Sequence, residues 1–190
     1  MPETEISRKT TALVVIDLQK GIAARPTQPH SPAVVIKNAA RLVQAFRKNG
    51  MPVCLVHVVL TPETMLKVKS DETLSRAGPM PPDWSDFIPE IAPVATDIVI
   101  GKKQWGAFYG TDLELQLRRR GMDTIVLCGI ATDYGVESTA RFAYEYGFEQ
   151  VFAEDAMASH TAEQHHAAVN FVFKRMGQVR STDEILAAIR

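Results

Sequence analysis

The sequence predicts an α/β protein: a Rossmann-like three-layer sandwich in which helices cover both faces of a parallel sheet. Short apolar runs rich in β-branched residues, such as Thr11–Ile16 and Asp123–Cys128, alternate with longer stretches whose apolar residues recur at helical spacing. This alternation repeats about six times, and it requires crossover connections that place helices on both faces of a parallel sheet. The second observation is that polar residues and glycines follow directly after several apolar runs, where an open parallel sheet binds its ligands.

The composition suits one soluble domain spanning residues 1–190. Hydrophobic residues make up 46% of the chain and charged residues 23%, and the net charge is −1. These values give no reason to expect nucleic acid or a membrane as a partner. The two cysteines, Cys54 and Cys128, lie inside apolar runs, which is no disulfide framework and fits a reducing compartment. The N-terminal residues lack the pattern of a signal peptide, so we expect a cytoplasmic protein.

Each element has its own local signal. Ser31-Pro32 has the pattern of a helix start, and Asn49-Gly50 that of its end. Capping-box spacing at Thr111, Thr161 and Ser181 predicts three further helix starts. A helix is also expected from Val136 to Tyr146. The expected strands are residues 11–16, 53–60, 97–100, 123–128, 150–153 and 178–180.

Asp17 directly follows the first predicted strand, and Gln19 comes two residues later. The residue pattern alone favours a local cap for Asp17, because most aspartates at strand ends serve the following turn. For Gln19, a substrate contact and a loop-anchoring hydrogen bond are equally compatible with the sequence.

Lys102 and Lys103 follow the third predicted strand, and Trp105, Phe108 and Tyr109 come next. By position alone, a lysine there is most often a surface residue. The alternative is a functional role, in which the lysine supplies a fixed positive charge beside Asp17 and polarises a substrate. Trp105 and Tyr109 either wall a pocket or simply pack, whereas packing is favoured for Phe108.

The stretch Gly129–Ala140 joins the fourth predicted strand to a helix through a tight turn. A helix start at the carboxyl end of a strand offers backbone N–H groups to an anion. Gly129 and Gly135 are expected to let the backbone approach a ligand closely.

Three blocks together resemble the isochorismatase-like, or cysteine hydrolase, superfamily. They are the stretch Gly129–Ala140, the run from Asp17 to Gly21, and the run from Lys102 to Gly121. Most members of that superfamily carry a nucleophilic cysteine where this chain has Gly135, and true isochorismatases also have glycine there. The resemblance implies strand order 3-2-1-4-5-6 and a non-proline cis peptide between Ile130 and Ala131.

The resemblance also assigns roles. It makes Asp17 the catalytic acid and Lys102, not Lys103, the catalytic lysine, with Gly135 beside them. It implies a hydrolase that acts on a vinyl ether, amide or ester through activated water, without a cysteine nucleophile. A lysine beside Asp17 opposes the raised pKa that a proton donor needs. The sequence leaves this conflict open. The expected substrate contacts are Gln19, Trp105, Tyr109, Ala131, Thr132 and Tyr134.

A second function class is a non-catalytic small-molecule-binding protein, supported by the absent nucleophile. Asp17 and Lys102 argue against it, because a pure binder does not need both. A screen of amide, ester and vinyl-ether substrates would separate the two.

No metal site and no cofactor are predicted. His57 stands alone in its strand, and His165 and His166 are adjacent, whereas a helical metal pair needs i, i+4 spacing. His160 is the third histidine of that region.

Residues 61–94 form a long irregular connection, expected to be either a cover for the site or an oligomer contact. Trp84 and Phe87 are expected to offer apolar surface, and we expect a homodimer or homotetramer.

Overall fold

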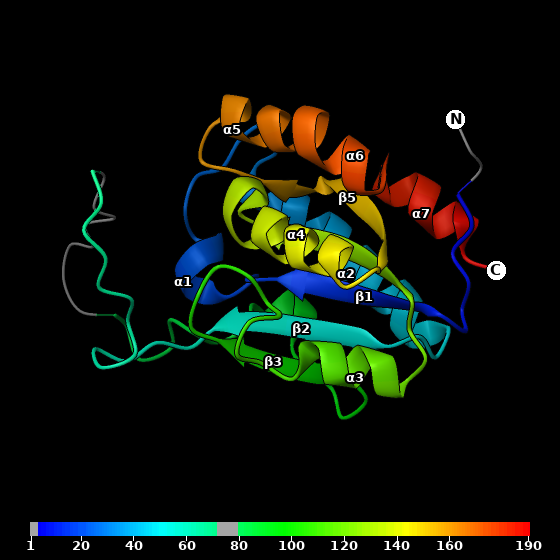
Figure 1. The fold of residues 1–190 in the computed structure, drawn as a ribbon, viewed down its shortest axis with the longest axis horizontal. Helices are drawn as coiled ribbons and strands as arrows, with labels where there is room; N and C mark the ends of the chain where they lie inside the picture. Colours follow the sequence, from blue (N-terminus) through cyan, green and yellow to red (C-terminus); the bar gives the residue numbers. More distant parts are fainter. Residues whose placement is uncertain (1–3, 72–79) are drawn as a thin grey trace.

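A computed structural model describes residues 4–71 and 80–190, and it is built around a parallel sheet (Figure 1). The six strands have the order β3-β2-β1-β4-β5-β6, so the predicted fold class and strand order are confirmed. Their bounds are β1 Thr11–Ile16, β2 Val53–Val58, β3 Ile98–Lys102, β4 Thr124–Ile130, β5 Glu149–Ala158 and β6 Gln178–Arg180. All strand pairs are parallel, which places every strand's carboxyl end at the same edge.

Helices cover both faces of this sheet (Figure 1). One face carries α2 and α7, and the other carries α3, α4 and the long helical segment that begins with α5. The α-helices are α1 Lys20–Ala23, α2 Pro32–Lys48, α3 Leu113–Arg119, α4 Glu137–Glu145, α5 Ala162–Ala167, α6 Lys174–Met176 and α7 Thr182–Ala188. The segments η1 Pro89–Ile91, η2 Thr132–Val136 and η3 Ala168–Phe173 are a 3₁₀ helix and two π-helical stretches.

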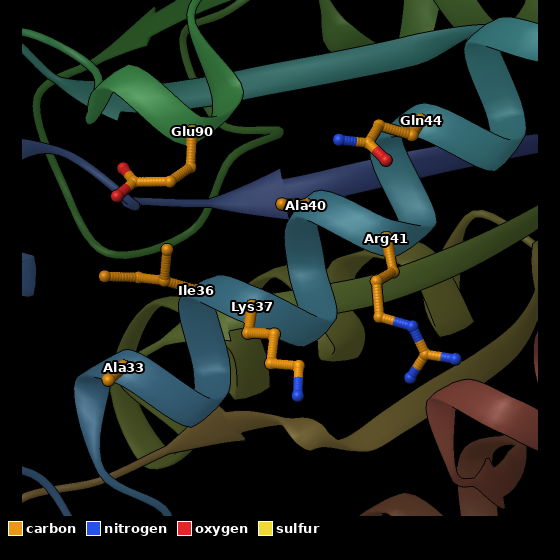
Figure 2. Close-up of a pocket in the computed structure, with 7 residues that line it drawn as sticks. All are labelled: Ala33, Ile36, Lys37, Ala40, Arg41, Gln44 and Glu90. Atoms are coloured by element: carbon orange, nitrogen blue, oxygen red, sulfur yellow. The ribbon is translucent and has the colours of Figure 1, made fainter.

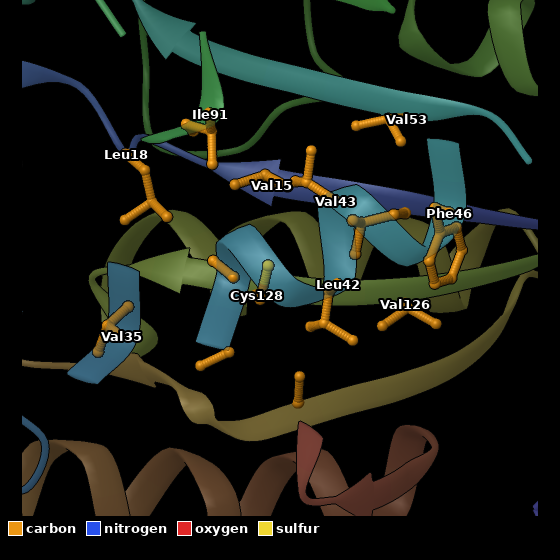
Figure 3. Close-up of a cluster of buried hydrophobic side chains, with 14 of the residues drawn as sticks. Val15, Leu18, Val35, Leu42, Val43, Phe46, Val53, Ile91, Val126 and Cys128 are labelled. Atoms are coloured by element: carbon orange, nitrogen blue, oxygen red, sulfur yellow. The ribbon is translucent and has the colours of Figure 1, made fainter. Parts of the chain in front are cut away.

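The central strand β1 is buried on both faces, as its continuous apolar sequence predicts. Leu13 and Val15 pack against α2, in the cluster of buried side chains that Figure 3 shows. Ala12, Val14 and Ile16 belong to the second cluster, together with side chains of α3 and α4. The alternation of side chains along a strand therefore divides the core into two layers.

The outer face of α2 is exposed and carries a shallow hollow of about 550 Å³ (Figure 2). This hollow is lined by Ala33, Ile36, Lys37, Ala40, Arg41, Gln44 and Glu90. None of them is a predicted site residue. Within the described residues, no helix is long and apolar enough to cross a membrane.

The largest departure from the predicted elements is β5, which extends beyond Ala153 to Ala158. Its pairing with β4 shifts between Leu127↔Phe152 and Gly129↔Met157, so extra residues of β5 bulge out of the ladder. Glu154 lies in this bulge. A bulge re-aims the side chains that it carries, which sequence periodicity cannot reveal.

Two of the three predicted capping boxes form. The side chains of Thr161 and Ser181 each accept a hydrogen bond from the backbone of the N3 residue. The N3 side chain accepts in turn from the backbone N–H of the capping residue. At α3 the prediction is wrong: the N-cap residue is Asp112, without a side-chain cap bond. The hydroxyl of Thr111 instead donates to the carbonyl oxygen of Ala107, because the preceding loop brings that acceptor within reach.

Candidate active site

Asp17 and Lys102 come together at the carboxyl edge of the sheet. Asp17 follows the end of β1, and Lys102 is the last residue of β3. The Lys102 Nζ lies 2.9 Å from Asp17 Oδ2 and also donates to the carbonyl oxygen of Trp105. Asp17 is 5% exposed and Lys102 1% exposed, so the pair is shielded from bulk water.

The other carboxylate oxygen of Asp17 is left without a partner. Among the described residues, no hydrogen-bonding group reaches Asp17 Oδ1, although the atom is buried. Asp17 also has a φ of 56°, a left-handed conformation that is costly outside glycine. Strained backbone and an unpartnered buried polar atom are both typical of functional sites.

Burial decides the pKa of Asp17. Desolvation raises the pKa of the Asp17 carboxyl group to about 6, against the charge and hydrogen bond of Lys102, which lower it. The conflict that the sequence left open is therefore resolved in favour of a raised pKa. A carboxyl group of this pKa exchanges protons near neutral pH.

Gly135 lies against this pair, in η2 directly before α4. A Cβ atom at position 135 would lie 3.0 Å from Asp17 Oδ2 and 3.2 Å from Lys102 Nζ. It would also lie 2.8 Å from Ile16 Cγ2, which is closer than real Cβ contacts. Ile16, Asp17 and Lys102 thus close around a residue without a side chain.

The turn before Gly135 has the predicted cis peptide between Ile130 and Ala131. Gly129 plays a different role from the one expected. Its φ is +126°, and a Cβ there would lie 2.0 Å from the carbonyl oxygen of Ile16. The close approach that the structure shows at Gly129 is therefore to β1.

Several backbone N–H groups of this turn already have acceptors. Those of Tyr134 and Val136 donate to the carbonyl oxygen of Ala131, and that of Asp133 donates to Ser159 Oγ. These three groups would have to leave their acceptors before they could bind an anion.

Two residues predicted to contact a substrate have buried side chains that form hydrogen bonds within the protein. Gln19 is fully buried: its amide donates to the carbonyl oxygens of Val58 and Trp84, and its oxygen accepts from Val58 N–H. Thr132 is also fully buried, with Oγ1 2.9 Å from His165 Nδ1. Of the two alternatives for Gln19, the loop-anchoring hydrogen bonds are present.

Of the aromatic residues predicted to contact a substrate, Trp105 and Tyr134 lie together, whereas Tyr109 lies elsewhere on the surface. Trp105 and Tyr134 meet edge to face with ring centroids 4.8 Å apart. Ala131, at the start of the same turn, is 9% exposed. Tyr109 is 68% exposed on the surface.

The segment that contains Trp84 and Phe87 covers the loop after β1. Gln19 and Phe87 form an antiparallel bridge, and Lys20 and Gly21 donate backbone bonds to Asp86 and Trp84. The Trp84 ring occupies the position that a Cβ of Gly21 would need. Trp84 is only 8% exposed, so the expectation that it offers apolar surface is wrong. Residues 72–79 of the long connection lie outside the described residues.

Neither cysteine can replace the missing nucleophile. Cys54 and Cys128 are both fully buried, and burial raises the pKa of each thiol to about 12. Both thiols are therefore protonated and inaccessible at neutral pH.

The structure also gathers a group that the sequence did not single out. His30 Nε2 and His165 Nε2 each lie 3.0 Å from Glu154 Oε1. His30 and Glu154 are 124 positions apart, so no local spacing could have revealed the group. Of the three neighbouring histidines that the sequence analysis considered, His165 belongs to this group, whereas His160 and His166 do not. His57 packs as expected, with Nδ1 2.7 Å from the carbonyl oxygen of Ser85.

The sequence matches the isochorismatase domain over residues 11–184. It is 50% identical over 186 residues to YecD of Escherichia coli O157:H7, described as an uncharacterized isochorismatase family protein, covering 97% of this chain and 99% of that protein. This protein therefore belongs to the isochorismatase family.

Solved structures agree with this assignment. An isochorismatase family protein from Burkholderia thailandensis superimposes with a TM-score of 0.90 at 44% identity, covering 95% of each chain. The N-carbamoylsarcosine amidase of Thermoplasma acidophilum superimposes with a TM-score of 0.73 at 28% identity, covering 92% of this chain and 97% of that one. The fold is therefore that of a family of hydrolases of small molecules.

Proposed function

We propose that this protein hydrolyses a small organic molecule with activated water, using Asp17 for proton transfer and Lys102 as a fixed cation. One observation carries the proposal: the buried Asp17 Oδ1 has no hydrogen-bond partner among the described residues, while Oδ2 is held by Lys102. A carboxyl oxygen left unpaired beside a fixed positive charge is suited to a substrate or a water molecule. The family membership and the amidase of the same fold support hydrolysis as the reaction class.

Gly135 determines which hydrolytic route is open. It has no side chain that could form an acyl-enzyme, and both thiols of the chain are buried. Water must then attack the substrate directly. Among vinyl ethers, amides and esters, a vinyl ether suits this arrangement best, because its hydrolysis begins with protonation and needs no covalent intermediate.

The Asp17 carboxyl group donates its proton to the terminal carbon of the vinyl ether, and the π electrons form the new C–H bond. Water adds to the resulting oxocarbenium carbon and returns one proton to the Asp17 carboxylate. The hemiketal then breaks its C–O bond: the hydroxyl oxygen becomes the carbonyl oxygen of one product, and its proton is transferred to the leaving oxygen, which departs as an alcohol. Lys102 holds Asp17 in place and stabilises the carboxylate that remains after Asp17 has donated its proton.

The test is a panel of small amides, esters and vinyl ethers, assayed with purified wild-type protein and the Asp17→Asn variant. Activity on at least one vinyl ether is expected, with a loss of at least ~10²-fold in Asp17→Asn, because the amide cannot transfer the proton. Lys102→Met is expected to impair turnover as well. Wild-type activity should survive iodoacetamide, since no accessible thiol takes part.

Two results would contradict the proposal. Turnover that Asp17→Asn leaves intact would remove Asp17 from the chemistry. Binding of a panel compound without any turnover would favour the alternative, a non-catalytic small-molecule-binding member of the family.

A further inference from the structure

Three side chains from three separate elements converge beside the turn that leads to Gly135. His30 lies in the loop before α2, Glu154 lies in the bulge of β5, and His165 lies in α5. Their ligating atoms, two imidazole nitrogens and one carboxylate oxygen, all lie within 4.8 Å of one another. The two imidazole rings approach edge to face, with centroids 5.7 Å apart and planes at 87°.

Hydrogen bonds around each of the three residues hold their positions. The loop before α2 is held to the end of β5 by reciprocal backbone bonds between Gln28 and Ser159. The bulge turns Glu154 out of the β4–β5 ladder, and the capping box at Thr161 holds the start of α5. The group is therefore placed by the fold and not by chance contacts of mobile side chains.

Two imidazole nitrogens and one carboxylate oxygen form a donor set that suits a transition-metal ion. We propose that His30, Glu154 and His165 bind a divalent transition-metal ion, with Zn²⁺ as the ion that this set of two imidazoles and one carboxylate fits. Ca²⁺ and Mg²⁺ prefer oxygen ligands, whereas imidazole nitrogen suits zinc and its neighbours. Three protein ligands leave a fourth position of a tetrahedral ion open.

The distances are close to those that such an ion requires. Zinc bonds of ~2.1 Å in tetrahedral geometry put ligand atoms about 3.4 Å apart. Both histidine nitrogens already lie 3.0 Å from the same Glu154 oxygen. The two histidine nitrogens lie within 4.8 Å of each other. Small side-chain rotations therefore bring all three atoms to the distances that a zinc ion requires.

Burial and the surrounding hydrogen bonds fit the same interpretation. The His165 side chain is fully buried, and its second nitrogen, Nδ1, lies 2.9 Å from Thr132 Oγ1. Such a bond from the second ring nitrogen fixes the ring of a metal-binding histidine. The side chains of His30 and Glu154 are 26% and 32% exposed, which leaves the open position accessible to solvent.

Charge favours the binding of a cation. Glu154 contributes a carboxylate oxygen to the group, and a carboxylate brings a negative charge to a divalent ion. Through His165 and Thr132, a bound ion would also hold the start of η2, the segment that carries Gly135.

The experiment is a titration of tag-free, metal-stripped protein with Zn²⁺, with Co²⁺ as a spectroscopic probe. One equivalent of Zn²⁺ is expected to bind and to raise the melting temperature. Co²⁺ is expected to give the visible absorption of a site with nitrogen and oxygen ligands. His30→Gln and Glu154→Gln, at partly exposed positions, should each weaken Zn²⁺ binding by at least ~10²-fold, since even outer partners of a metal site are worth ~10–100-fold.

The matched control is His166→Gln. His166 is exposed and its ring lies 5.6 Å from that of His165, but it is not one of the three ligands. This variant should bind Zn²⁺ as the wild type does. A wild-type protein that takes up no stoichiometric Zn²⁺ would overturn the proposal. So would binding that persists equally in the His30→Gln and Glu154→Gln variants while circular dichroism shows all proteins folded. Neither outcome depends on the hydrolytic activity proposed above.

Discussion

The Asp17 carboxyl group is subject to two opposing influences of different size. Removal from water penalises its charged form, and the ammonium group of Lys102 favours that form. Desolvation is the larger effect, so the pKa rises from 3.8 to about 6. A group of this pKa is half protonated near pH 6 and is mostly ionised at pH 8.

The pH dependence of turnover follows from this value. If the protonated Asp17 donates the proton, kcat/KM is constant below pH 6 and falls about tenfold per pH unit above it. The measurement is a pH profile of kcat/KM on the active substrate found in the panel, with Asp17→Asn as the control that should lack this limb. A rise in kcat/KM above pH 6 would show instead that Asp17 acts as a base.

The close contacts around Gly135 predict how substitutions at this position affect stability. A Cβ at this position would lie 2.8 Å from Ile16 Cγ2 and would press on both members of the buried pair. Gly135→Ala is therefore expected to lower the free energy of unfolding by about 1–3 kcal/mol, the usual cost of overpacking. Gly135→Cys should do the same, and no thiol-dependent activity is expected without a shift of Ile16. Denaturant unfolding measures both effects.

The matched control for this prediction is Gly101→Ala. A Cβ at position 101 would meet Val59 at an ordinary 3.5 Å, so little change in stability is expected. Equal stability of Gly135→Ala and wild type would mean that the site has more room than these contacts indicate.

At the scale of elements, Asp155 joins two helices to the sheet. Its Oδ1 accepts hydrogen bonds from the N–H and the hydroxyl group of Thr182, at the start of α7. Its backbone oxygen and Oδ2 accept from the Asn38 amide of α2. The bulge in β5 is what points this side chain toward both helices.

Asp155→Ala is expected to lower the free energy of unfolding by about 2–3 kcal/mol, because Thr182 is fully buried and would lose its acceptor. Asp183→Ala, one residue further along α7, is the control. Asp183 pairs with Arg41 but its side chain is 79% exposed, so its loss should matter far less. Similar losses for the two variants in urea unfolding would contradict the role given to Asp155.

At the scale of the whole molecule, we propose a homodimer or homotetramer. Trp84 cannot support this, since it is buried within the chain. Other apolar side chains are exposed around α3 and α4, among them Leu115 at 47%, Phe142 at 38% and Tyr146 at 40%. The ring centroids of Phe142 and Tyr146 lie 6.2 Å apart, and exposed apolar side chains that lie together are typical of a contact surface.

Sedimentation velocity at micromolar concentration is expected to show a species of at least twice 21.0 kDa. Phe142→Arg should shift the distribution toward the monomer, because a charge at the contact is costly to bury. Lys174→Ala, outside this group of side chains, should leave the distribution unchanged. A single 21.0 kDa species of the wild-type protein would contradict the proposal.

The sequence alone determines the architecture and the position of the central residues. Apolar runs and helical spacing dictate a parallel sheet, and parallel strands end at one edge. Asp17 and Lys102 each lie at the carboxyl end of a predicted strand, and Gly135 lies in the turn after a third strand. With the strand order that the family resemblance implies, the sequence therefore predicts that the three residues come together. Capping patterns at Ser31, Thr161 and Ser181 are equally local, because a cap involves only neighbouring residues.

The tertiary structure decides whatever depends on distances across the chain. The pKa of Asp17 depends on the effect of burial and on the opposing effect of the ion pair with Lys102. The magnitude of neither effect can be obtained from the order of residues. The hydrogen bonds of Gln19 and Thr132 are made with partners far along the sequence. His30, Glu154 and His165 meet only because a bulge in β5 turns one side chain toward a distant loop, and a bulge is a property of strand pairing rather than of either strand alone.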